Sequence, residues 1–210
     1  MAYSVKEIFY TLQGEGHNAG RPAVFCRFSG CNLWSGREID RSSAICQFCD
    51  TDFVGVSGDG GGKFESAPEL VQAVMKFWPE RYSGKRLVVC TGGEPLLQLD
   101  EALLAEFHEH SLEVAVETNG TVPAPAGIDW ICVSPKHGTQ LVIRKGDELK
   151  VVYPQATDPR TYESLDFKHF YLQAMDGPQQ AKNLSEAVQF CLDYPNWQLS
   201  LQTHKLLGLR

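Results

Sequence analysis

The sequence lacks an excess of basic residues and lacks any long apolar run. Its 19 Lys and Arg residues are outnumbered by 26 Asp and Glu residues, which gives a net charge of −7, whereas a broad nucleic-acid surface needs positive charge. No stretch approaches the roughly 20 apolar residues of a membrane-spanning helix. Lys6 and Glu7 lie where an export signal would have its apolar segment. These absences predict a cytoplasmic protein without nucleic-acid or membrane partners.

Cysteine is present, but not in the pattern of a disulfide framework. The seven cysteines are an odd number, and a reducing cytoplasm does not maintain such a framework. Four lie in apolar runs, where a small buried hydrophobic residue is the simplest interpretation: Cys26, Cys90, Cys132 and Cys191. The other three are close together in the spacing C-x14-C-x2-C: Cys31, Cys46 and Cys49.

Thiolates at this spacing suit zinc or an iron–sulfur cluster. Structural zinc is nearly always closed by four ligands, so His17 or Cys26 would have to complete a zinc site. A 4Fe–4S cluster held by three thiolates instead leaves one iron open to a ligand. Phe48, directly before the last cysteine, offers an aromatic face to a flat ring beside that iron. The number of ligands favours the cluster and leaves a zinc-stabilised binding module as the alternative.

Short runs rich in Val, Ile, Phe and Tyr predict strands, and several of them alternate with helical patterns. The predicted strands cover residues 5–10, 23–28, 87–91, 113–117, 130–134, 148–153, 169–173 and 197–202. The predicted helices cover residues 66–82, 97–110 and 184–194, and the glycine-rich residues 57–63 are expected to form a loop or hairpin tip. A complete eight-fold barrel needs about 250 residues. We therefore expect one α/β domain over residues 1–210, an incomplete (β/α) barrel of about six parallel strands.

Four of the predicted strands are followed by polar or glycine-containing motifs. They are residues 91–95 (TGGEP), 117–120 (ETNG), 134–136 (SPK) and 171–176 (YLQAMD). The carboxyl ends of parallel strands share one edge of a barrel, where ligand groups gather. With the three cysteines, these motifs resemble the radical S-adenosylmethionine (SAM) superfamily, whose cluster motif is C-x3-C-x2-C and which carries a GGE motif after a strand. The first cysteine spacing, 14 residues instead of 3, is a departure from that pattern.

Four segments are similar to one family of this superfamily, the 7-carboxy-7-deazaguanine synthases of queuosine and preQ0 biosynthesis. They are residues 7–16 (EIFYTLQGEG), 27–34 (RFSGCNLW), 49–53 (CDTDF) and 201–205 (LQTHK). Some members of that family share the enlarged first spacing. The resemblance implies a carbon–nitrogen lyase that contracts the ring of 6-carboxy-5,6,7,8-tetrahydropterin to 7-carboxy-7-deazaguanine and releases ammonia. The 5′-deoxyadenosyl radical of SAM takes a hydrogen from C6 and the hydrogen returns, so SAM acts catalytically, and Mg²⁺ assists.

The resemblance also implies roles for individual residues. The expected metal ligands are Cys31, Cys46 and Cys49 for the 4Fe–4S cluster and Thr51 for Mg²⁺. The expected SAM-binding residues are Phe48, Cys49, Asp50, Gly93, Glu94, Ser134, Pro135, Lys136, Gln173, Ala174, Met175 and Asp176. The expected substrate-binding residues are Leu12, Gln13, Gly14, Glu15, Arg27, Thr91, His204 and Arg210. Glu15, Glu117 and His204 are candidates for proton transfer, and none is assigned as the acid or base.

The chemistry of the side chains supports several of these roles. The guanidinium group of Arg27 can bind a substrate carboxylate through two parallel hydrogen bonds. Thr51 offers the hard oxygen that Mg²⁺ prefers, although a threonine at this place could equally cap a helix. The terminal carboxylate of Arg210 offers two acceptors for the neighbouring N–H donors of a pterin's aminopyrimidine edge.

Two segments outside the predicted strands are expected to fold against the site. Residues 32–45 contain Leu33, Trp34 and Ile39, which are too apolar for a purely solvated loop, so we expect them to cover the cluster with at least one helical turn. The chain ends in residues 206–210 (LLGLR), whose leucines predict a docked tail instead of a frayed terminus.

The resemblance implies further partners and leaves one alternative within the superfamily. We expect a homodimer that receives electrons from a flavodoxin or ferredoxin. The alternative is an activase that makes a glycyl radical on a partner protein, although the ordinary C-x3-C spacing is expected there.

Replacing Cys31, Cys46 or Cys49 singly by Ala is expected to abolish cluster assembly, because each thiolate holds one iron. The control variants Cys26→Ala, Cys90→Ala and Cys191→Ala are expected to keep about four irons per chain. Iron and sulfide analysis after anaerobic reconstitution measures both groups. Equal iron loss in the two groups would contradict the ligand assignment.

Overall fold

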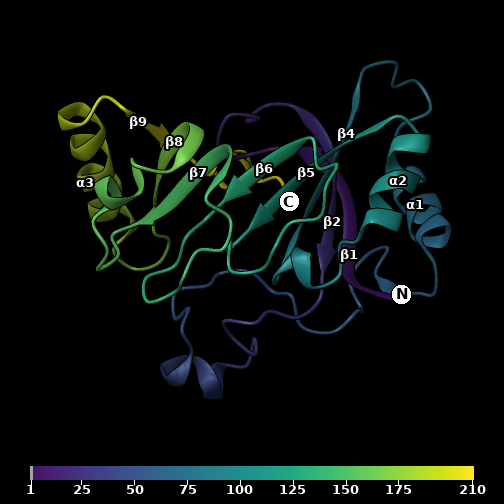
Figure 1. Cartoon of the computed structure of the whole chain (residues 1–210), viewed down its shortest axis with the longest axis horizontal. Helices are drawn as coiled ribbons and strands as arrows, with labels where there is room; N and C mark the ends of the chain where they lie inside the picture. Colours follow the sequence, from purple (N-terminus) through teal and green to yellow (C-terminus); the bar gives the residue numbers. More distant parts are fainter. Residues whose placement is uncertain (1) are drawn as a thin grey trace.

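The computed structural model describes residues 2–210, whose strands form one nine-stranded sheet (Figure 1). The strands are β1 Tyr3–Leu12, β2 Pro22–Phe28, β3 Gly62–Phe64, β4 Arg86–Gly92, β5 Leu112–Thr118, β6 Trp130–Val133, β7 Lys145–Tyr153, β8 Asp166–Ala174 and β9 Trp197–Ser200. The α-helices are α1 Ala67–Met75, α2 Glu101–Glu109, α3 Gln180–Asp193 and α4 Thr203–Leu207. The 3₁₀ segments are η1 Glu38–Ser43, η2 Pro95–Leu97 and η3 Pro159–Tyr162.

The sheet is an open, mainly parallel barrel wall with the strand order β3-β1-β2-β4-β5-β6-β7-β8-β9. Strand β1 pairs antiparallel with β2 and β3, and every pair from β2 to β9 is parallel. Residues 2–210 thus contain seven consecutive parallel strands where about six were predicted. Across the described chain, no strand pairing joins β9 back to β1 or β3, so the incomplete barrel predicted from the sequence is confirmed.

The longer helices cover the two ends of the sheet. Helix α1 packs against α2, α2 packs against β5, and α3 packs against β8 and β9. Figure 1 shows α1 and α2 at one end of the sheet and α3 at the other. The middle of the sheet is connected by loops, since the β5–β6 and β6–β7 segments contain no helix within the described part of the chain. These loops begin at the carboxyl edge, where the polar strand-end motifs lie.

Local sequence signals explain where the helices differ from their predicted bounds. The first ends early, at Met75, because Pro79 lacks the N–H that would bond the Met75 carbonyl in a continued helix. The second begins late, because the side chain of Asp100 accepts a hydrogen bond of 2.9 Å from the Leu103 amide and thereby caps it. The third begins earlier than predicted, at Gln180.

The glycine-rich residues 57–63 form more than the predicted loop or hairpin tip. Their last residues enter β3, which pairs with Tyr3–Val5 of β1. A Cβ atom at Gly61 would lie 2.2 Å from the carbonyl oxygen of Lys6. Glycine at this position therefore lets the segment lie directly against the outer edge of β1.

Cysteines outside the cluster motif behave as predicted with one exception. Cys26, Cys90 and Cys132 are buried, whereas Cys191 on α3 is only partly buried, and all seven cysteines are free thiols. Among residues 2–210, none of the helices has both the length and the apolar character needed to cross a membrane.

Candidate active site

A cavity of about 360 Å³ opens at the carboxyl edge of the parallel strands, which is a volume typical of small-molecule sites. Every residue that the sequence predicts to bind metal, cofactor or substrate lines this cavity, with two exceptions. The exceptions are Glu94 and Pro135. The structure thus brings together segments that lie far apart in the sequence, while the role of each residue stays a prediction.

The loop that carries the first cysteine is seated on the Gly92–Gly93 pair at the end of β4. Gly92 has a φ of +127°, and a Cβ atom there would lie 2.2 Å from the Phe28 carbonyl oxygen. A Cβ atom on Gly93 would lie 2.0 Å from the carbonyl oxygen of Gly30 and 3.0 Å from the Cβ atom of Cys31. The absence of a Cβ atom at these two positions lets the cysteine loop lie directly against the end of β4.

All three cysteines of the cluster motif line the cavity. The sulfur of Cys31 accepts a hydrogen bond of 3.4 Å from the Leu33 amide. A hydrogen bond from the Cys46 thiol lowers the pKa of Cys49 and raises that of Cys46. No three His, Cys, Asp or Glu side chains of residues 2–210 are grouped to hold a single metal ion. A 4Fe–4S cluster makes a different demand, because each thiolate binds a different iron.

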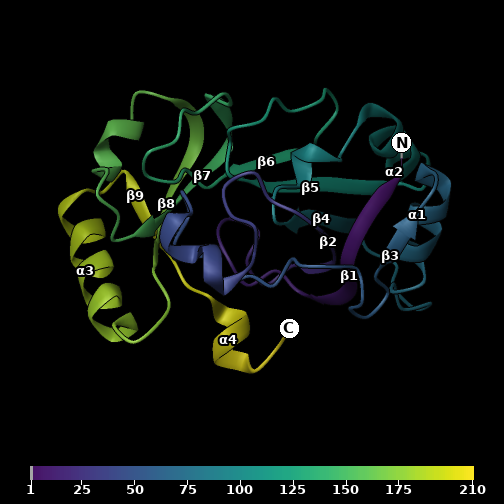
Figure 2. The same ribbon diagram turned by 90° about the horizontal axis from the view of Figure 1, so that it is seen from below.

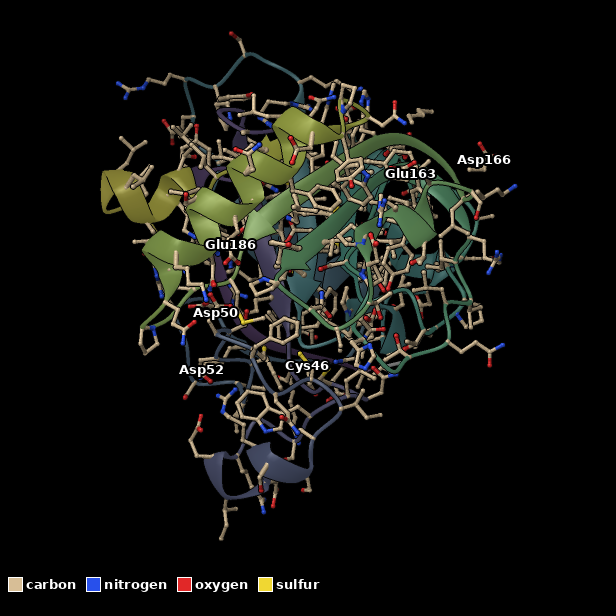
Figure 3. All side chains as sticks on the ribbon, turned by 90° about the vertical axis from the view of Figure 1, so that its left-hand side faces the viewer. Cys46, Asp50, Asp52, Glu163, Asp166 and Glu186 are labelled. Atoms are coloured by element: carbon tan, nitrogen blue, oxygen red, sulfur yellow. The ribbon has the colours of Figure 1, made fainter. Side chains whose placement is uncertain are left out.

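The inserted residues 32–45 contain the helical turn that was predicted, in the form of η1. Leu33 and Trp34 are buried, and Trp34 packs edge-on against Phe53 with ring centroids 5.6 Å apart. The expectation for Ile39 is wrong, because this side chain is 87% exposed. Figure 3 shows Cys46 and Asp50 between the sheet and η1. The apolar start of the insert therefore packs beside the cysteines, whereas η1 projects into solvent.

The carboxylate of Glu94 lies beneath the cavity instead of within it. This side chain is fully buried and accepts hydrogen bonds from the Leu96 amide at 3.0 Å, the Thr118 hydroxyl at 2.7 Å and the Asn119 amide at 2.8 Å. Burial raises its pKa, and the three hydrogen bonds oppose that shift. Glu94 thus joins η2 to the end of β5, and the backbone of Gly92 and Gly93 is what this motif presents to the cavity.

Lys136 supplies a half-buried cation beside the cysteines. Its Nζ donates to the Ser134 carbonyl oxygen at 2.6 Å and to the Ser134 hydroxyl at 2.7 Å, and it lies 6.0 Å from the centre of the Phe48 ring. Burial lowers the pKa of Lys136, while the nearby Cys46 and Cys49 raise it. The hydrogen-bond partners of this ammonium within residues 2–210 are neutral, which leaves it suited to an anionic ligand.

On the other side of the cavity, a network of charged groups surrounds Lys150, which the sequence analysis missed. Its Nζ lies 2.5 Å from Glu15 Oε2 and 3.8 Å from Glu117 Oε1. Gln13 Nε2 donates to Glu117 at 3.0 Å, and Gln202 Nε2 donates to Glu15 at 3.0 Å. Burial would lower the pKa of Lys150, but Glu117 and Glu15 raise it well above its usual value. Lys150 in turn holds the pKa of Glu15 low against the effect of burial.

The strand pattern contained a signal for Lys150. Residues at alternate positions of a strand face the same side, and Glu148 and Lys150 are two such residues around Leu149 and before the apolar residues Val151 and Val152. Both are buried, with exposures of 3% and 4%. Charged residues at alternate positions of a buried parallel strand therefore indicate an interior polar site, because an unpaired charge is rarely buried.

Arg27 on β2 reaches the cavity next to a carboxylate that orients it. Its Nε donates to Glu7 Oε1 at 2.8 Å, and its guanidinium carbon lies 5.9 Å from the centre of the Phe9 ring. Within the described residues this is the only side-chain hydrogen bond of Arg27, so its two terminal nitrogens stay available. The arrangement presents two parallel N–H donors to the cavity, as a bound carboxylate requires.

The C-terminal tail crosses the open side of the sheet from β9 towards β1 (Figure 2). Thr203 donates through its amide and its hydroxyl to the Gly14 carbonyl oxygen, both at 3.0 Å. A Cβ atom on Gly14 would lie 2.2 Å from Nδ1 of His204. At the end of the tail, the Thr11 hydroxyl donates to a terminal oxygen of Arg210 at 3.0 Å, and the Arg210 guanidinium pairs with Glu7 at 2.9 Å.

The sequence predicted that the leucines of residues 206–210 would dock the tail. The tail does contact the site, but these leucines are not the cause. Leu206 is 75% exposed and Leu207 is 64% exposed, and Leu209 is also exposed. In the short helix α4, Thr203 and Lys205 contact partners in the site, whereas the two leucines are exposed. Polar contacts therefore hold the tail.

Thr51 lies in the cavity wall between the cysteine loop and Asp52. No helix begins near it within the described chain, since η1 ends at Ser43 and the next helix, α1, starts at Ala67. The helix-cap interpretation of Thr51 is therefore wrong, and the residue lines the cavity.

Comparisons with known proteins agree with this geometry. A family profile described as the Radical SAM superfamily matches residues 40–166. The chain is 61% identical to 7-carboxy-7-deazaguanine synthase of Bordetella pertussis and 59% identical to that of Bradyrhizobium diazoefficiens, in each case over 100% of both chains. The crystal structure of QueE from Escherichia coli is similar with a TM-score of 0.71, covering 96% of this chain and 94% of that one at 24% identity. At that identity the structural likeness bears on the fold alone.

The close contact between Gly93 and the cysteine loop can be tested by substitution. Gly93→Ala is expected to displace the backbone at Gly30 and Cys31, because the added Cβ meets backbone atoms that cannot turn aside. The matched control is Gly62→Ala, whose Cβ would meet only the Phe64 ring at 3.6 Å. Iron content after anaerobic reconstitution should fall in Gly93→Ala and stay at the native value in Gly62→Ala. A native iron content in Gly93→Ala would show that the close contact at Gly93 is not required for cluster assembly.

Proposed function

The chain belongs to the 7-carboxy-7-deazaguanine synthases of the radical SAM superfamily, and we propose that it contracts the ring of 6-carboxy-5,6,7,8-tetrahydropterin to 7-carboxy-7-deazaguanine. Ammonia is the second product, SAM is used catalytically, and Mg²⁺ assists. Membership of this family implies a 4Fe–4S cluster and SAM as cofactors. We further propose that an external flavodoxin or ferredoxin supplies the electron and that the enzyme acts as a homodimer.

The cysteine side of the cavity fits the two cofactors. Three thiols of suitable softness line it, and the amide at Leu33 donates to the Cys31 sulfur, a contact that tunes clusters. When bound, the cluster and SAM supply the radical that removes a hydrogen atom from the substrate. Lys136, oriented by Ser134, would bind the carboxylate of SAM. Phe48 would pack against the flat ring of SAM.

The opposite side of the cavity fits the pterin. The free donors of Arg27 would bind the substrate carboxylate. Gln13 and Glu15 would accept hydrogen bonds from the N–H-rich edge of the ring, with Lys150 keeping Glu15 ionised and therefore an acceptor. The carboxylate of Arg210, held by the Thr11 hydroxyl, would add two acceptors. Leu12, Gly14, Thr91 and His204 would complete the wall of this subsite.

The proposal rests on one observation: the residues expected to bind the cofactors and those expected to bind the substrate line the same cavity. The three cysteines and Lys136 lie in the same cavity as Arg27, Glu15 and Arg210. A cofactor on the first group and a carboxylated, N–H-rich ring on the second would therefore meet within one cavity. A zinc-stabilised binding module has no use for the second group, and the full-length likeness to these synthases favours a synthase over an activase.

Anaerobically reconstituted protein with SAM, Mg²⁺, a chemical reductant and 6-carboxy-5,6,7,8-tetrahydropterin is the direct test. We expect 7-carboxy-7-deazaguanine in many turnovers per SAM, measured by liquid chromatography and mass spectrometry. Reductive cleavage of SAM without that product would show a radical SAM enzyme with another substrate.

Thr51→Ala is expected to raise the Mg²⁺ concentration for half-maximal turnover at least about tenfold, since loss of interactions at a metal site weakens binding by that order. Thr51→Ser keeps the hydroxyl and should restore the native Mg²⁺ dependence, while iron content stays unchanged in both variants. An unchanged Mg²⁺ dependence in Thr51→Ala would remove this residue from the metal site.

Adding one glycine after Arg210 is expected to raise the KM for the pterin roughly tenfold or more, because hydrogen bonds to charged groups contribute about 1.5–3 kcal/mol. Arg210→Ala keeps a terminal carboxylate and loses half-exposed ion pairs with Glu7 and Asp59 and a contact with the Phe9 ring, so its effect should be about fivefold or less. Deleting Arg210 should act like the extension, and SAM affinity and iron content should survive in all three. If Arg210→Ala had the larger effect, the guanidinium group and not the carboxylate would be the important part of the tail.

A further inference from the structure

One lysine of the tail joins two carboxylates of the opposite cavity wall. Lys205 Nζ lies 2.7 Å from Asp50 Oδ2 and 2.6 Å from Asp176 Oδ2. Asp50 directly follows Cys49, and Asp176 follows the end of β8, so the two acids come from different segments. All three side chains line the cavity, and Figure 3 shows Asp50 beside the loop that carries Cys46.

The two aspartate carboxylates are held close to each other by the ammonium group of Lys205. Their carboxylates share one ammonium group, and without it two like charges would face each other across the cavity wall. Each uses only Oδ2 for Lys205: Oδ1 of Asp176 accepts the Gly177 amide at 2.8 Å. Oδ1 of Asp50 accepts no hydrogen bond within residues 2–210 and is therefore open to a hydroxyl group in the cavity.

The same lysine lies on a segment that cannot hold its shape alone. Helix α4 spans only Thr203–Leu207, and an isolated helix of one turn is unstable in water. Its leucines are exposed, so its position rests on polar contacts: those of Thr203 with Gly14, of Lys205 with the two aspartates, and of Arg210 with Glu7. Of these, Lys205 alone reaches the segments on the cysteine side.

We propose that Lys205 is a positioning residue that couples SAM binding to ordering of the tail that completes the pterin subsite. The inference rests on the proposed function for the identity of the two ligands. SAM that engages residues 50 and 173–176 fixes the two aspartates where Lys205 bridges both, and the bridged lysine fixes α4. By linkage, an ordered tail must strengthen SAM binding by the same factor.

The expected strength of the coupling between SAM binding and tail ordering follows from the solvent exposure of the three charged side chains. The side chains of Lys205, Asp50 and Asp176 are 35%, 47% and 36% exposed, and ion pairs of this kind contribute modestly. Couplings between sites are typically about 5- to 150-fold, and partial exposure puts this one near the lower end. We expect SAM to bind roughly fivefold more weakly to Lys205→Met than to the native protein.

Hydrogen–deuterium exchange of cluster-loaded protein, with and without SAM and with no pterin present, tests the proposal. In the native protein, SAM should slow exchange of the amides of residues 203–209. In Lys205→Met this SAM-dependent protection should disappear, and in Lys205→Arg it should remain. Lys182→Met is the matched control, because that lysine is an exposed residue of α3 paired only with Glu186 at 3.7 Å; it should leave both the protection and the SAM affinity unchanged.

Two results would overturn the coupling. One is a tail whose exchange SAM does not change in the native protein, and the other is equal SAM-dependent protection in Lys205→Met. Asp176→Asn gives a second variant, which should also lose most of the protection while iron content stays native. Because the readout needs no pterin, SAM-dependent protection together with no deazaguanine product would reject the proposed substrate and leave the coupling standing.

Discussion

The ammonium group of Lys150, buried between the carboxylates of Glu15 and Glu117, is the interaction on which the open barrel depends. It joins β7 to the end of β5 and to the loop that follows β1, across the side where the sheet does not close. Removing one partner of a buried ion pair typically costs about 3–5 kcal/mol, because the other charge is left unpaired. The same contact keeps Glu15 charged, so one interaction both joins three segments of the open barrel and prepares an acceptor in the cavity.

Because the sheet stays open, the site is completed by segments that are not strands. The cysteine loop reaches the cavity over Gly92 and Gly93, and the tail reaches it over Gly14. In both places an added Cβ would collide with the segment that carries chemically important groups. The glycines thus let the cysteine loop lie directly against the end of β4 and the tail lie directly against the loop that follows β1.

Much of this arrangement could be predicted from the sequence, and the reasons differ between residues. Cys31, Cys46 and Cys49 were recognisable from their spacing in the sequence. The strand-end motifs were recognisable because parallel strands end at one edge, whatever the details of packing. Lys150 left a signal in the alternation of its strand, but its partners Glu15 and Glu117 could not be read from that pattern. Lys205 was missed because its partners lie more than 25 residues away, which neither spacing nor periodicity reveals. The SPK and GGE motifs were found, but the sequence could not show that Glu94 turns away from the cavity.

The exposed leucines mark the limit of reasoning from hydrophobicity. Leu206 and Leu207 suggested docking by apolar contact, yet they lie outside while Lys205, between His204 and Leu206, makes the contacts. Apolar character predicts burial well for strands of a common core, such as Val88 and Val114. In a one-turn segment such as α4, the nearest surface determines which side chains make contacts, and here that surface is polar.

The most direct test is a crystal structure of the anaerobically reconstituted enzyme with SAM and the carboxytetrahydropterin. Iron should be bound by Cys31, Cys46 and Cys49, and the pterin should lie between SAM and the tail. Its carboxylate should contact Arg27, and its N–H edge should contact Glu15, with Lys150 still between Glu15 and Glu117. A pterin bound outside this cavity, or iron held by other residues, would contradict the account.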